Sequence, residues 1–132
     1  MLRAFNPVLA VGPCFASDAE FRKARQALAR EGMTLLSART QDEAALMLCE
    51  TAPSVVMIHL SLDDGSPLAV ADFANYRRPD ARVILLGGGG LMADGSLFAH
   101  VGNAHALISG DMPPTDLTAL IAFHAGAASM MH

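Results

Sequence analysis

The sequence predicts an α/β domain in which five short parallel strands alternate with five helices in three layers. Short apolar runs alternate along the chain with longer segments whose apolar residues recur at helical spacing. The composition is 52% hydrophobic but only 5% aromatic, so aliphatic side chains must fill the core, as in a parallel sheet covered by helices on both faces. A chain of 132 residues has the size of one domain. We therefore expect a single domain over residues 1–132.

The first strand and the first helix have clear signals. The run PVLAV at 7–11 is apolar throughout and predicts a buried strand. Ser17 and Glu20 have the spacing of a capping box, in which each side chain binds a free backbone amide at a helix start. Gly32 supplies the stop for this helix.

The next unit repeats this arrangement. TLLSA at 34–38 predicts the second strand, and Thr40 and Glu43 form a second capping-box pair. Pro53 ends that helix, and SVVMIHL at 54–60 predicts the third strand. Because this run is apolar on both faces up to its histidine, it is typical of a central strand.

The second half of the chain continues the alternation. We expect a helix beginning at Ser66-Pro67, a strand over 82–86, a weaker helix over 96–101, a strand over 104–109 and a helix after Pro113-Pro114. The packed core is expected over about 7–125, with a frayed tail over 126–132.

Charge and composition bear on whole classes of function. The net charge of −4 provides no attraction for nucleic acid, and the basic residues Arg22, Lys23, Arg25 and Arg30 are expected on a solvated helix face. No apolar run approaches the ~20 residues that cross a bilayer. The two cysteines share no metal-ligand spacing. We expect a cytoplasmic protein that binds neither nucleic acid nor membrane.

Candidate functional residues follow the strands, because ligands of open parallel sheets bind at the carboxyl ends of the strands. We call the rim where these ends meet the carboxyl edge. The candidates there are Gly12 to Phe15, Ala38 to Thr40, His59 to Gly65, Gly87 to Gly90 and Ser109 to Met112.

The order of elements and the frame PSVVMIHLSLDDGSP…ARVILLGGG…AHALISGDMPP resemble the CheY-like receiver domains of response regulators. The resemblance extends over about 7–125. It implies a flavodoxin-like sheet with strand order 2-1-3-4-5 and a role in two-component signalling. Working receivers of this family carry a magnesium-binding acidic pair after the first strand and a phosphorylated aspartate ending the third. A Thr or Ser ends the fourth strand, and a lysine ends the fifth.

All of these chemical positions depart from the family pattern. The acidic pair falls on Gly12 and Pro13 (on Pro13 and Cys14 if the register slips by one), the phosphoacceptor on His59, the Thr/Ser on Gly87 and the lysine on Gly110. The chain has a single lysine, Lys23, and it lies in the first predicted helix. A carboxylate attacks phosphorus poorly unless cations neutralise the surrounding oxygens, so the resemblance implies a degenerate receiver that is not phosphorylated.

Three features of this edge allow both functional and purely structural interpretations. His59 could act as a phosphohistidine, a metal ligand or a pH-responsive group, but a single histidine here is more often packed and hydrogen-bonded. The glycines Gly87, Gly88, Gly89 and Gly90 could cradle an anion, although we favour a mobile loop. Asp63 and Asp64 are explained by a turn ending in glycine, with an acidic rim as the alternative.

The expected function is regulation through a protein partner, a kinase or regulator of a signalling pathway, without cofactor, metal or enzymatic activity. A homodimer is a further expectation. Receivers commonly bind partners through their fourth helix, fifth strand and fifth helix, which here points to Phe98, Val101, Leu120, Ile121, Phe123 and His124. The alternative is a sensor of a nucleotide or other anion at the emptied acidic pocket. An enzyme ranks last, because no nucleophile–base pair or dinucleotide fingerprint occurs.

Overall fold

A computed structural model describes residues 6–87, 104–109 and 112–130. Strands and helices alternate along it: β1 (Pro7–Val11), α1 (Asp18–Arg30), β2 (Thr34–Ala38), α2 (Gln41–Glu50), β3 (Val55–His59), α3 (Pro67–Arg77), β4 (Arg82–Gly87), β5 (Ala104–Ser109) and α5 (Pro114–Met130). The expected helix over 96–101 lies outside the described residues. The described residues contain four helices. Helix α5 continues through 126–130, which is part of the tail expected to fray.

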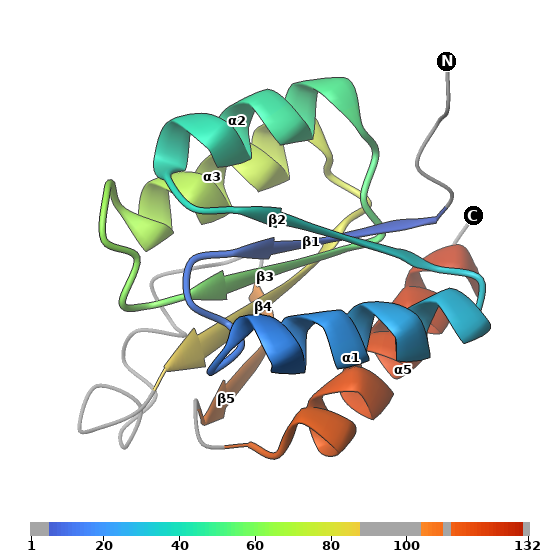
Figure 1. Ribbon diagram of the computed structural model, residues 1–132. Helices are drawn as coiled ribbons and strands as arrows, with labels where there is room; N and C mark the ends of the chain where they lie inside the picture. The colour runs from blue at the N-terminus through green and yellow to red at the C-terminus, as the bar shows by residue number, and fades with distance from the viewer. Residues whose placement is uncertain (1–5, 88–103, 110–111, 131–132) are drawn as a thin grey trace.

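The sheet is parallel, with strand order β2-β1-β3-β4-β5. Helices α2 and α3 cover one face, and α1 and α5 cover the other (Figure 1). The predicted α/β class with a helix-covered parallel sheet is confirmed. None of the helices in the described residues is long and apolar enough to cross a membrane.

The helices begin where the local signals place them. Ser17 accepts a hydrogen bond from the backbone amide of Glu20 (3.2 Å), and the Glu20 carboxylate accepts one from the amide preceding the cap (3.0 Å). Thr40 and Glu43 repeat this exchange at 3.1 and 2.7 Å. Ser66 caps α3. These bonds satisfy amides that have no partner inside the helix, which explains why the predicted starts are confirmed.

The core forms one layer on each face of the sheet. The layer beneath α2 and α3 receives Leu9, Val11, Val56 and Ile58 from the central strands. The layer beneath α1 and α5 receives Val8, Ala10, Val55 and Met57. Because successive strand residues point to opposite faces, β1 and β3 must be apolar at every position to feed both layers.

The strand register sets which residues meet at the carboxyl edge. Val11, the last residue of β1, pairs with Ile58 of β3, and His59 pairs with Leu86 of β4. The residue that follows β1 and the last residues of β3 and β4 therefore lie side by side. These are Gly12, His59 and Gly87, three of the positions singled out by the sequence.

Candidate functional site at the carboxyl edge

Gly12 and His59 are in contact across the edge. A Cβ atom placed on Gly12 would lie 3.4 Å from the Cβ of His59 and 3.4 Å from Cδ1 of Leu62. Gly12 has a φ of +83°, in the left-handed region that favours glycine, and its amide donates to the carbonyl of Ala38 (2.9 Å). The side chain of Leu62 is buried, with 8% exposed. The first position of the acidic pair therefore holds a half-buried glycine beside Leu62, and the second holds the exposed Pro13.

Gly87 is covered in the same way on the other side of His59. A Cβ on Gly87 would lie 2.8 Å from Cδ1 of Leu60 and 3.1 Å from its Cβ and Cγ, which is closer than side chains normally approach. The Leu60 amide donates to the carbonyl of Leu86 at 2.7 Å and so fixes the leucine beside the end of β4. A serine or threonine at position 87 would need Leu60 to move.

Leu60 and Leu62, which follow His59 in the chain, thus each lie against a glycine at a neighbouring strand end. We call this pair the leucine bracket. It gives an apolar surface to the strand ends at Gly12 and Gly87, and both leucines pack on the core layer beneath α2 and α3. Apolar side chains supply no charge that could hold a phosphoryl group or a metal ion. The sequence analysis identified the missing charged residues at this edge, but it did not predict that Leu60 and Leu62 pack against the two glycines.

His59 itself has a partner within its own loop. Its Nδ1 accepts a hydrogen bond from the backbone amide of Ser61 (3.0 Å), so the neutral ring carries its proton on Nε2. Burial lowers the pKa of His59, because the charged ring loses contact with water. This arrangement matches the packed, hydrogen-bonded interpretation of the residue. Within the described residues, no group of three His, Cys, Asp or Glu side chains is placed to hold a metal ion.

The loop after β3 is attached to α2. Asp63 and Asp64 have exposed side chains at the rim, while the carbonyl of Asp64 accepts a hydrogen bond from the amide of Gln41 (2.9 Å). The amide of Ser66 donates to Oε1 of Gln41 (2.8 Å). Gly65 has a φ of +117°, as the turn interpretation requires. Sequence analysis missed Gln41, whose partners lie more than twenty residues away.

Cys14, the alternative acidic-pair position, is chemically quiet. The residue as a whole is half-buried, but its thiol faces inward and donates to the carbonyl of Val11 (3.4 Å). Burial raises the pKa of Cys14 to about 12, so the thiol stays protonated and is a poor nucleophile. Cys49 is exposed at the end of α2.

The residues expected at an interface are divided by the structure. Ile121 and His124 are buried in the core, Leu120 is half-buried, and Phe123 is 67% exposed. Nδ1 of His124 accepts a hydrogen bond from Nε of Arg82 (3.0 Å). Ile121 and His124 share the helix face that packs on the sheet, so a partner surface on α5 can include Phe123 but not these two. Phe98 and Val101 lie outside the described residues, as do Gly88, Gly89, Gly90 and Gly110.

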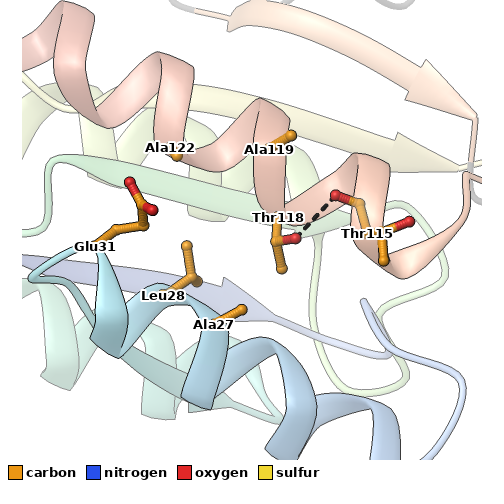
Figure 2. Close-up of a pocket in the computed structure, with 7 residues that line it drawn as sticks. All are labelled: Ala27, Leu28, Glu31, Thr115, Thr118, Ala119 and Ala122. Atoms are coloured by element: carbon orange, nitrogen blue, oxygen red, sulfur yellow. Dashed lines mark hydrogen bonds between the residues drawn. The ribbon is translucent and has the colours of Figure 1, made fainter.

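A groove between α1 and α5 has no counterpart in the sequence analysis. It encloses about 370 Å³ and is lined by Ala27, Leu28, Glu31, Thr115, Thr118, Ala119 and Ala122 (Figure 2). The Thr118 hydroxyl donates to the carbonyl of Thr115 (2.9 Å), so it is already engaged within its own helix. The small side chains leave space between the helices, but they bring no reactive groups together.

No family model matches the chain. It is 27% identical over 81 residues to the photosynthetic apparatus regulatory protein RegA of Cereibacter sphaeroides, a match that spans 61% of this chain and 44% of RegA. The chain therefore aligns with less than half of that regulator.

Solved structures resemble the whole fold. A CheY-like response regulator receiver domain protein from Methanospirillum hungatei superposes with a TM-score of 0.77 at 20% identity, covering 100% of both chains. The receiver domain of a putative LuxO repressor protein from Vibrio parahaemolyticus gives a TM-score of 0.76 at 21% identity, covering 98% of this chain and 95% of that one. The chain thus has the fold of CheY-like receiver domains.

Proposed function

We propose that the chain is a receiver-like domain of a two-component-type signalling pathway that is not phosphorylated and acts by binding another protein. The observation that supports this most directly is the leucine bracket, which packs against Gly12 and Gly87 at the strand ends on either side of β3. In this proposal the domain has kept the receiver fold while its phosphorylation chemistry has been replaced by apolar packing.

A phosphoryl group at His59 would be poorly stabilised. It would bring between one and two negative charges beside Leu60 and Leu62. The neighbouring strand end offers Gly12 rather than a carboxylate for magnesium, and the only lysine of the chain, Lys23, is exposed on α1. The positions of this chain that match the receiver motif therefore lack the charges that normally make such a transfer favourable.

Phe123 supports the protein-binding half of the proposal. Its ring is 67% exposed and packs edge-on against His124, with ring centroids 5.4 Å apart. An exposed aromatic ring held in place by a buried neighbour can bury apolar area on a partner with little loss of conformational freedom. The resemblance to receivers favours a kinase or regulator as that partner, with a second copy of the chain as the further candidate.

Intact-mass spectrometry after incubation with acetyl phosphate and Mg²⁺ tests the phosphorylation half. We expect no added phosphoryl mass on the wild type. We also expect none on His59→Asp, because this variant restores a carboxylate but leaves the leucine bracket and the missing acidic pair unchanged. A phosphoryl adduct that disappears in His59→Asn would refute the proposal.

Affinity capture from the host tests the binding half. We expect a kinase or response regulator to be recovered equally with and without the phosphodonor. Phe123→Ala should weaken recovery, whereas Tyr76→Ala, which removes an 80% exposed ring from α3, should not. If instead no protein is recovered and nucleotides or anions give a saturable thermal shift, the ligand-sensor alternative replaces this proposal.

A further inference from the structure

The segment 60–66, which we call the strap, joins β3 to α3 and is held at two places. At its far end it is bound by Gln41, the first residue of α2. The Gln41 amide donates to the carbonyl of Asp64 (2.9 Å), and Oε1 of Gln41 accepts from the amide of Ser66 (2.8 Å). Thr40 and Asp64 also pair as a parallel bridge. One residue thus binds the strap through both its main chain and its side chain.

Gly65 makes this attachment close. A Cβ atom on Gly65 would collide with the Cβ of Gln41 and lie 2.6 Å from its Oε1, so any other residue would clash with the glutamine. The φ of +117° at Gly65 is also a conformation that residues with side chains rarely adopt. The strap therefore lies directly on the Gln41 side chain.

The near end of the strap covers the carboxyl edge. Leu62 lies against Gly12, Leu60 lies against Gly87, and the Ser61 amide donates to Nδ1 of His59. Surface loops usually have few buried side chains and few fixed partners. This strap has a buried leucine at one end and a two-bond attachment at the other, with the exposed side chain of Asp63 between them.

We propose that the strap is a lid over the carboxyl edge and that Gln41 is its latch. With Gln41 engaged, Leu62 lies against Gly12 and the Ser61 amide stays bound to the His59 ring. With Gln41 released, the strap lifts, and the backbone of Gly12 and the ring of His59 become open to solvent. This inference rests on the contacts of Gln41 and is independent of whether the domain is phosphorylated or which protein it binds.

Hydrogen–deuterium exchange on the full chain tests the latch. In Gln41→Ala, the amides of 61–66 should exchange about tenfold faster, because the bond from the Ser66 amide to Oε1 is lost while the main-chain bond to Asp64 and the rest of the fold remain. Gln41→Glu keeps an acceptor oxygen of the same reach and should exchange like the wild type. Gln26→Ala, at an exposed glutamine on α1, is the matched control and should change nothing in the strap.

Two results would overturn the lid. One is wild-type exchange of 61–66 in Gln41→Ala. The other is a uniform acceleration that includes β1 and α5, which would make Gln41 an ordinary structural residue. Proton NMR of the His59 ring gives a second readout: opening the strap should move the pKa of His59 toward its usual value in Gln41→Ala but not in Gln41→Glu. An unchanged His59 titration would also contradict the proposal.

Discussion

The side chain of Leu60 occupies the space that a side chain at Gly87 would need. A Cβ at position 87 would lie 2.8 Å from Cδ1 of Leu60 and 3.1 Å from its Cβ. The resemblance to receivers assigns to position 87 the Thr or Ser that ends their fourth strand. Because Gly87 has no side chain, Leu60 can pack at the end of β4.

Gly87→Ser should destabilise the protein by about 1–3 kcal/mol, since overpacking forces Leu60 from its position. Chemical denaturation of Gly87→Ser, Leu60→Ala and the double variant measures the coupling. We expect the double variant to lose less than the sum of the single losses, because the smaller side chain relieves the collision. Additive losses would show that the two residues are not in conflict.

Leu62→Ala should lower the free energy of unfolding by about 2–4 kcal/mol, because it removes a buried side chain and leaves a space over Gly12. Leu46→Ala is the matched control, since Leu46 is 57% exposed on α2, and it should change stability by no more than about 0.5 kcal/mol. Urea denaturation of both variants provides the comparison. Equal, small losses would mean that Leu62 contributes nothing to closing the edge.

His59 should make the protein less stable at low pH. Its pKa is lowered in the folded state by burial, so the unfolded chain binds the proton more readily, and stability rises with pH across this window. The contribution is fully present above the usual histidine pKa of about 6.5 and is lost as the pH falls through the lower folded value.

The comparison is between the wild type and His59→Asn, in which the side-chain oxygen can still accept from the Ser61 amide. Denaturation at pH 7.5 and 5.5 should show a larger loss on acidification in the wild type. If both proteins lose the same stability, the acid sensitivity arises from other groups.

Arg78 should stabilise the end of α2. Its Nε donates to the carbonyl of Leu48 (2.8 Å) and its Nη2 to that of Cys49 (3.2 Å), two carbonyls at a helix end that carries no basic residue of its own. Arg78→Ala should cost about 1 kcal/mol, because the site is half-buried. Arg77→Ala, an exposed arginine next to it, should be nearly neutral in thermal denaturation. A loss of the same size in both variants would mean that the two bonds to α2 contribute nothing measurable.

Local signals made the scaffold predictable. Capping pairs such as Thr40 and Glu43 depend on residues three apart, and buried strands depend on short apolar runs, so both can be read directly from the sequence. The third strand was predicted over 54–60 and is observed over Val55–His59. The register that brings Gly12, His59 and Gly87 together follows from this order of elements.

The leucine bracket and the Gln41 latch were not predictable in the same way. The contact between Leu62 and Gly12 joins residues fifty positions apart, and the bond between Gln41 and Ser66 spans 25. Both depend on side-chain positions that only the folded loop determines, and a glutamine after a helix cap carries no special signal. On α5, the family resemblance alone suggested Ile121 and His124 for an interface, and the structure buries both.

Amide NMR during titration with Mg²⁺ and beryllofluoride, which mimics a bound phosphoryl group, tests the central claim most directly. If the leucine bracket has replaced the phosphorylation site, the amides of Gly12, Ser61 and Gly87 should not shift. Saturable shifts at these three amides would show that the edge still holds a cation and a phosphoryl group, and would contradict the account.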